Sequence, residues 1–82
     1  MATCTIYEKS KYFNLDEWVM VGNLNPSTAT VLHAGWEHDE DTKLKLLEAL
    51  MENGEIIIHR NHYYDYDSTG FTEAQFKLVM ND

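Results

Sequence analysis

The residues of this chain that could do chemistry are mainly carboxylates, and they gather in two short stretches. The first, the acidic cluster, consists of Glu37, Asp39, Glu40 and Asp41. The second, the acid–tyrosine stretch, consists of Tyr63, Tyr64, Asp65, Tyr66 and Asp67. Clustered carboxylates bind metal ions, exchange protons with a substrate, or attract a basic surface. The rest of the sequence helps to choose among these three kinds of chemistry.

The charge balance favours a basic protein partner. Fourteen Asp and Glu oppose six Lys and Arg, which gives a formal net charge of -8. Residues 13–42 contain six carboxylates and no Lys or Arg. Such a surface repels nucleic acid and anionic membranes and attracts basic proteins. A net charge of up to about 8 in magnitude also keeps a small domain soluble, which needs no partner at all.

The tyrosines between the acids point to a protein interface. Tyrosines stack on bases in nucleic-acid-binding proteins, but there they are interleaved with Lys or Arg rather than Asp. In protein interfaces, tyrosine is a frequent anchor. We therefore predict that the acidic cluster and the acid–tyrosine stretch bind a basic surface of a protein, with Trp36 as a further anchor.

Carboxylates on a small rigid domain can also imitate a nucleic-acid backbone and occupy a basic channel. Small acidic phage-encoded inhibitors of restriction, CRISPR or repair enzymes are similar to this chain in size and charge balance. The similarity is one of composition, and no motif carries it. It implies an inhibitor of a nucleic-acid-processing complex as a more specific form of the same prediction.

A metal-binding module is an alternative. Residues 65–70 resemble the first half of an EF-hand calcium loop, with Glu73 at the ninth position. The twelfth position, which needs a bidentate Glu, is Phe76. His33, Glu37 and His38 could share one side of a helix, but a zinc site needs three or four converging ligands, and no spacing in the sequence forces these residues to converge. We expect no bound cofactor.

Catalytic motifs are missing from the sequence. It has no nucleophile elbow, no glycine-rich phosphate loop and no CxxC pair. The acidic cluster could act in acid–base chemistry, but acids at a helix start are typical of a solvated terminus that complements the helix dipole. We therefore do not expect an enzyme.

The first half of the chain predicts two strands and two helices. Residues 3–8 and 17–21 are rich in β-branched and apolar residues and predict a hairpin. Residues 27–36 are compatible with helix or strand, and the cap signal of Asn25 before Pro26 favours a helix that ends near Gly35. Residues 39–53 predict an amphipathic helix with one apolar stripe, and Asn53–Gly54 predicts where this helix ends. The stripe is formed by Leu44, Leu46, Leu47, Leu50 and Met51.

The second half predicts a strand and a helix. Residues 55–64 contain three consecutive isoleucines, which predict a central strand covered on both faces, with a homodimer as one way to cover it. Residues 73–80 alternate as a strand would. However, Thr72 with Gln75 fits a capping box, flanked by Phe71 and Phe76, and favours a helix.

These elements predict one α+β domain over residues 1–82. A mainly antiparallel sheet of about three strands is covered by two or three helices, in the order β-β-(α)-α-β-α. Cys4 is the only cysteine, which fits a reducing cytoplasm. We expect neither a signal peptide nor a membrane span, because no apolar run has the required length.

Overall fold

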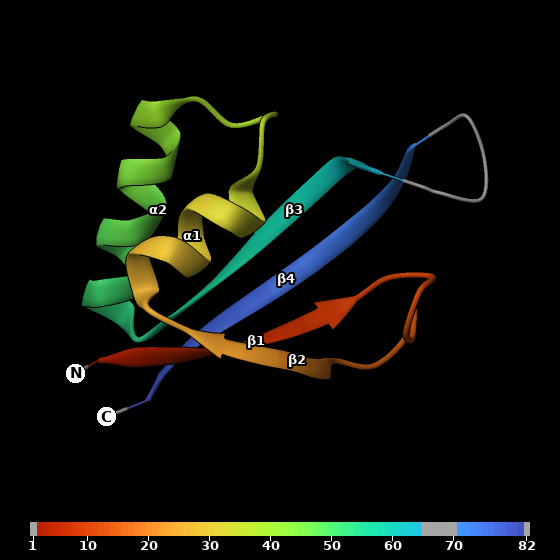
Figure 1. Ribbon diagram of the computed structural model, residues 1–82, viewed down its shortest axis with the longest axis horizontal. Helices are drawn as coiled ribbons and strands as arrows, with labels where there is room; N and C mark the ends of the chain where they lie inside the picture. The colour runs from red at the N-terminus through yellow and green to blue at the C-terminus, as the bar shows by residue number, and fades with distance from the viewer. Residues whose placement is uncertain (1, 65–70, 82) are drawn as a thin grey trace.

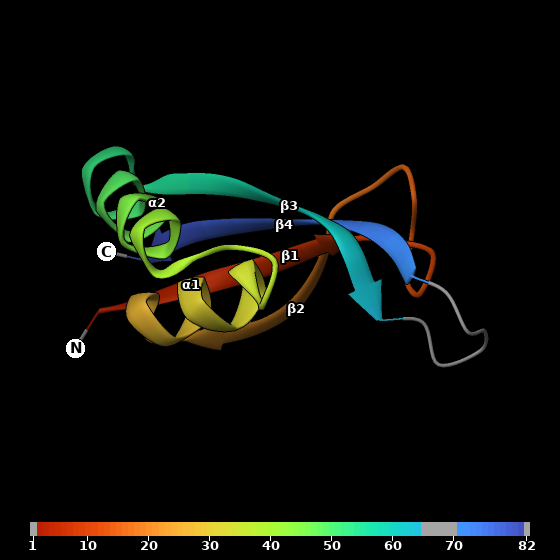
Figure 2. The same cartoon turned by 90° about the horizontal axis from the view of Figure 1, so that it is seen from above.

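The chain folds into one sheet with two helices on one of its faces. The computed structural model describes residues 2–64 and 71–81. The sheet is antiparallel, with strand order β2-β1-β4-β3, and Figures 1 and 2 show both helices on the same side of it. The elements are β1 (Thr3–Lys9), β2 (Val19–Leu24), α1 (Pro26–Ala34), α2 (Glu40–Asn53), β3 (Glu55–Tyr64) and β4 (Phe71–Asn81). The predicted α+β class is confirmed.

The two central strands come from opposite ends of the chain. β1 pairs with β4 from Thr3 opposite Asn81 to Lys9 opposite Gln75. β2 and β3 flank them as edge strands, each paired with its neighbour in sequence. The two ends of the chain consequently lie near each other at one end of the sheet (Figure 1).

The core lies between the sheet and the helices. Alternate residues of the strands point into it, because side chains alternate between the faces of a strand. Leu50 of α2 and Ala29 of α1 close it from the helical side. Its buried strand residues are Cys4, Ile6, Ile56, Ile58, Ala74, Phe76 and Leu78.

Both helices begin with a side-chain cap, and the sequence predicts the first of them. The side chain of Asn25 accepts hydrogen bonds from Ser27 N (2.9 Å) and Thr28 N (3.4 Å), and Pro26 opens α1. The side chain of Asp39 accepts one from Thr42 N (2.8 Å) at the start of α2. α2 ends at Gly54, which has φ of 82°. The helix prediction for residues 39–53 and the preference for a helix over residues 27–36 are confirmed.

The apolar stripe of α2 is divided between the core and the surface. Leu50 is fully buried and Leu46 packs against the core. In contrast, Leu44 and Met51 are 59% and 57% exposed. The predicted stripe is wider than the face that the sheet can cover.

The predicted C-terminal helix is wrong, because this segment is the central strand β4. Ala74, Phe76 and Leu78 are buried at every second position, which is the period of a strand. β4 pairs along its length with β1 and β3. Pairing on both sides and burial of this face outweigh the local preference of a capping box. The sheet therefore has four strands rather than three.

The three isoleucines belong to an edge strand, so the prediction of a central strand is also wrong. Ile56 and Ile58 face the helices and are 9% and 2% exposed. Ile57 points to the opposite face of the sheet and is 46% exposed. Within residues 2–64 and 71–81, helices cover one face of the sheet and leave the other without a helix.

Among residues 2–64 and 71–81, neither helix has the length and apolar character needed to cross a bilayer.

Candidate protein-interaction surface

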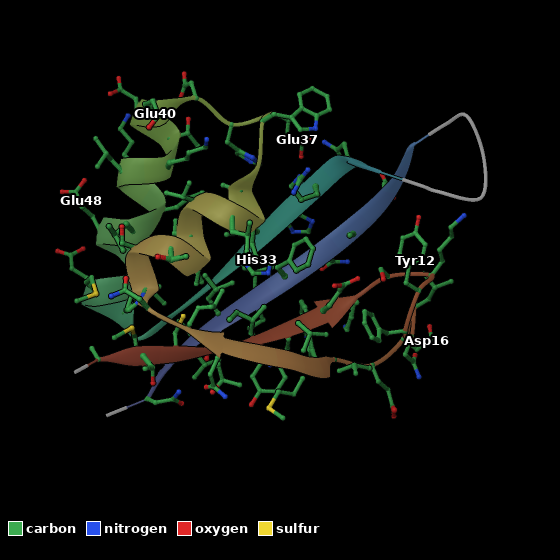
Figure 3. All side chains as sticks on the ribbon, in the orientation of Figure 1. Tyr12, Asp16, His33, Glu37, Glu40 and Glu48 are labelled. Carbon is green, nitrogen blue, oxygen red and sulfur yellow. The ribbon has the colours of Figure 1, made fainter. Side chains whose placement is uncertain are left out.

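The outer surface of the helices is strongly acidic. Residues 26–53 contain six carboxylates and two lysines. Four of these carboxylates, at Glu40, Asp41, Glu48 and Glu52, belong to exposed residues of α2. Figure 3 shows Glu40 and Glu48 pointing away from the sheet and the core. The side chain of Glu40 is 89% exposed even though it lies 3.7 Å from Lys43 Nζ.

Beside these acids runs an apolar groove between α1 and α2, here called the helix seam and formed by Val31, Leu44, Leu47 and Met51. Val31 is 50% exposed, close to the values for Leu44 and Met51. Two hollows of about 270 and 60 Å³ share Leu47 and Ser27 in their walls. Exposed apolar groups in one groove, next to charged groups, are typical of a protein-binding surface.

Glu37, a predicted site residue, faces inward. Its Oε1 accepts a hydrogen bond from Asn61 N at 2.9 Å and lies 3.7 Å from Arg60 Nε. The side chains of Glu37 and Arg60 are only 11% and 8% exposed. Figure 3 shows Glu37 above β3, apart from the acids of α2. In this structure Glu37 fixes the α1–α2 connection to the sheet.

Asp39 has a structural role although it is exposed. Hydrogen bonds from the side chain and backbone of Thr42 lower the pKa of the Asp39 carboxyl below its usual value. The carboxylate therefore stays charged while it caps α2. Asp39 lies beside Glu40 and Asp41, so these three residues of the acidic cluster share one end of the helix.

The acid–tyrosine stretch is only partly described. The backbone of Tyr63 and Tyr64 belongs to the end of β3, and their side chains lie outside what the structure describes. Asp65, Tyr66 and Asp67 lie outside the described residues, as does the half calcium loop of residues 65–70. Their part in one surface with the acids of α2 stays a prediction.

The open face of the sheet carries positive charge, which the sequence analysis missed. Lys77 Nζ lies 5.2 Å from the ring centre of Tyr7 and 5.1 Å from that of Trp18. Lys9 Nζ lies 4.7 Å from the same Trp18 ring. These are cation–π distances. Lys77 and Tyr7 are opposite each other in register, a relationship that could be seen only once residues 71–81 are recognised as a strand.

Beneath the helices lies a buried polar cluster that serves the fold. Ser10 Oγ donates a hydrogen bond to Glu8 Oε2 at 2.6 Å, and the two residues are 1% and 4% exposed. His33 Nδ1 lies 2.8 Å from Ala29 O, and its ring centre is 4.8 Å from that of Phe76. Burial lowers the pKa of His33. A nearly inaccessible Ser10 hydroxyl is unsuited to attack a substrate.

In the described part of the chain, no three His, Cys, Asp or Glu residues are grouped so that they could hold a metal ion. Comparisons of the chain with protein-family models, with curated proteins and with solved structures find no match.

Proposed function

We propose that this protein is a non-enzymatic interaction module that binds a basic surface of a partner protein through its helical layer. The observation that carries the proposal is the position of the helix seam next to the exposed acids of α2. Apolar groups supply interface anchors, and carboxylates steer a basic partner to them and fix its orientation. Neither group alone would be specific.

The finer proposal is that the partner's basic surface normally binds nucleic acid. The carboxylates of α2 recur at residues 40, 41, 48 and 52. At a rise of about 1.5 Å per residue, this row extends for roughly 18 Å. A row of negative charges of that length fits a basic nucleic-acid channel, where it would compete with phosphates. This supports an inhibitor of a nucleic-acid-processing complex inside the cell, in agreement with the single, buried and unpaired thiol of Cys4.

The test is capture of partner proteins from a lysate at about 0.05 and 0.5 M salt, which span the range over which surface charges become screened. Asp41→Lys combined with Glu48→Lys should remove the proteins that are captured by the wild type at low salt only. Glu55→Lys is the matched control, because Glu55 is exposed on the opposite face of the sheet. Retention of the same proteins by the double variant would contradict the proposal.

A captured protein should also be displaced by nucleic acid if the finer proposal is right. Titration of the complex with a short duplex DNA and a short RNA measures this competition. Failure of both to displace the partner would leave protein binding in place and rule out a nucleic-acid channel as its site.

A homodimer that covers the open face of the sheet is a second candidate. The observation that favours it is the exposure of Met20 and Ile57, at 60% and 46%, on a sheet face without helices. Light scattering measures the molar mass in solution, and Ile57→Lys should restore a monomer if this face is the contact.

A further inference from the structure

We propose that the helix seam binds an amphipathic helix of the partner protein. The apolar face of this helix lies in the groove, and its Lys or Arg residues meet the acids of α2 at the rim. The bound helix then forms a third helix of the layer, beside α1 and α2. This proposal deepens the proposed function and rests on it for the basic character of the partner.

The seam offers two hollows for apolar side chains. The larger, of about 270 Å³, lies between the start of α1 and the second half of α2, with Pro26 and Met51 in its wall. The smaller, of about 60 Å³, lies further along both helices, with Val31 and Leu44 in its wall. Both volumes are below the roughly 300–1,000 Å³ of common small-molecule sites. They suit single side chains of a partner protein rather than a whole small molecule.

The backbone of the two walls favours a helix as the occupant. Both walls of the seam are helices, whose backbone groups are already hydrogen-bonded within each helix. An extended segment in this groove would find no free backbone partners there, and buried N–H and C=O groups without partners are costly. A helix satisfies these groups within itself. The occupant of the seam is therefore helical.

The spacing of the exposed apolar residues fits the same occupant. Leu44 and Met51 are seven residues apart, which is about two turns of α2 and about 10.5 Å along its axis. A partner helix that lies along α2 presents side chains at positions i and i+7 with the same spacing, and a side chain at i+3 or i+4 lies over Leu47. Helices that dock into grooves use anchors at these positions.

The rim of the seam is acidic where its apolar residues are exposed. Glu40 forms part of the wall of the smaller hollow, and its side chain is 89% exposed. Glu48 follows Leu44 by one turn and precedes Met51 by one turn, so it neighbours both on the surface of α2. Glu48 is exposed, and Figure 3 shows it pointing away from the core. A helix in the seam therefore passes beside carboxylates, which attract Lys or Arg.

The two lysines of α2 do not reverse this charge. Lys43 Nζ lies 3.7 Å from Glu40 Oε1, and the Lys43 side chain is only 14% exposed. Lys45 is exposed. Because α2 contains four carboxylates and two lysines, its surface keeps a net negative charge after both lysines are counted.

A second copy of this chain is a poorer occupant than a basic partner. Its α1 contains no Lys or Arg, and its α2 is acidic. Either helix would therefore bring no opposite charge to the rim, and each copy adds a net charge of -8. Electrostatic complementarity selects a helix of different sequence.

The probe is a peptide of about 15 residues, which spans about 22 Å as a helix and so covers the seam. Binders to the full chain are selected from a displayed library of random peptides of this length. Each selected peptide is synthesised with Ala or with Pro at a central position where Ala leaves binding intact. Pro interrupts a helix but is compatible with an extended segment.

Two matched variants of the protein locate the binding site. Leu44→Ser combined with Met51→Ser removes two anchors of the seam, which are 59% and 57% exposed. The control is Met20→Ser combined with Leu32→Ser, at residues that are 60% and 61% exposed. Neither control residue lines the two hollows of the seam. Circular dichroism checks that each variant keeps its fold.

The selected peptides should carry apolar residues at i and i+7, with Lys or Arg beside them. They should gain helix on binding, as measured by circular dichroism, because isolated helices of this length are marginal in water. Their dissociation constants should rise about tenfold or more with the central Pro and with Leu44→Ser combined with Met51→Ser. The control variant should bind as the wild type does. Asp41→Lys combined with Glu48→Lys should weaken binding and reduce its dependence on salt.

Four outcomes would each overturn the proposal. They are equal affinity for the Ala and Pro peptides, binding that ignores Leu44→Ser combined with Met51→Ser, selected peptides without Lys or Arg, and a selection without binders. A wild-type dimer that Leu44→Ser combined with Met51→Ser converts to a monomer would also overturn it, because a second copy would then occupy the seam.

Capture of partner proteins from a lysate separates this proposal from the proposed function. If Asp41→Lys combined with Glu48→Lys abolishes capture while Leu44→Ser combined with Met51→Ser leaves it intact, the acidic surface still binds a basic partner and only the helix proposal fails. If neither double variant changes capture, both proposals fail.

Discussion

The guanidinium of Arg60 lies against Gly35, in the space that a Cβ at residue 35 would need, with Nη2 only 2.7 Å from that position. Gly35 has φ of 71° and ψ of -167°, a conformation that is essentially restricted to glycine. Arg60 Nη1 also donates a hydrogen bond to His33 O at 3.4 Å. The end of α1 is thus fixed to β3, and this contact sets where α2 and its acids lie over the sheet.

Gly35→Ala should therefore destabilise the protein by about 2 kcal/mol or more, because it adds both backbone strain and a collision with Arg60. Gly22→Ala is the control and should change stability by no more than about 0.5 kcal/mol, since its Cβ meets open space. Urea unfolding followed by circular dichroism measures both. Similar midpoints for the two variants would contradict the packing described for Arg60.

Glu37→Ala should lower stability by about 2 kcal/mol, because it leaves the mostly buried Arg60 without this carboxylate and Asn61 N without its acceptor. Glu48→Ala removes an exposed carboxylate and should change stability by less than about 0.5 kcal/mol. Urea unfolding measures the free energy of unfolding of both variants. The effects on partner binding should be the reverse of those on stability. Glu37→Gln should leave the salt dependence of partner capture unchanged, while loss of the Glu48 charge should weaken partner binding.

Local signals in the sequence predicted the helices well and the sheet less well. Asn25, Asp39 and Gly54 act within one turn of a helix, so their effect can be predicted without knowledge of the fold. The position of Phe76 depends instead on β1, almost 70 residues earlier in the chain. A capping pattern at Thr72 carries no information on the strands that pair with this segment on both sides, whereas the alternation of Ala74, Phe76 and Leu78 is typical of a strand.

The candidate site could also be predicted from the sequence only where its residues depend on local structure. Glu40 and Asp41 follow a helix start and are exposed, as expected for charges at a helix terminus. The inward turn of Glu37 depends on Arg60 and Asn61 of β3. It is a product of tertiary packing that no spacing in the sequence encodes.

The three isoleucines of β3 should differ sharply in their contribution to stability. Ile58→Ala should cost about 2–5 kcal/mol, because it leaves a cavity in the core. Ile57→Ala should cost less than about 1 kcal/mol, since its side chain is already 46% exposed. Thermal and urea unfolding measure both variants. Equal costs would mean that the open face is covered by a second copy in solution.

Two substitutions at Asp39 distinguish its role as the cap of α2 from the role of its negative charge. Asp39→Asn keeps an acceptor for Thr42 N and should preserve the helix, whereas Asp39→Ala should fray its first turn, as measured by amide exchange. Because the pKa of Asp39 is lowered in the folded state, its charge stabilises the fold above the unfolded pKa of about 4. This stabilisation is lost as the pH falls through the lowered pKa. If Asp39→Asn loses partner binding but keeps the helix, the charge itself contributes to the interface.

His33 should make stability depend on pH in the range where histidine titrates. Burial lowers its pKa below the value of about 6.5 expected in the unfolded chain, and the charge of Arg60 lowers it further, while the hydrogen bond to Ala29 O and the charge of Glu8 partly oppose this shift. Between these two pKa values the unfolded state binds more protons, so stability rises with pH. From about pH 7 to about pH 5 the free energy of unfolding should therefore fall.

The substitution His33→Phe tests this prediction. It keeps a ring next to Phe76 and should flatten the pH profile of the free energy of unfolding in this range, whatever its effect on stability at pH 7. An unchanged slope in His33→Phe would show that another group causes the acid sensitivity.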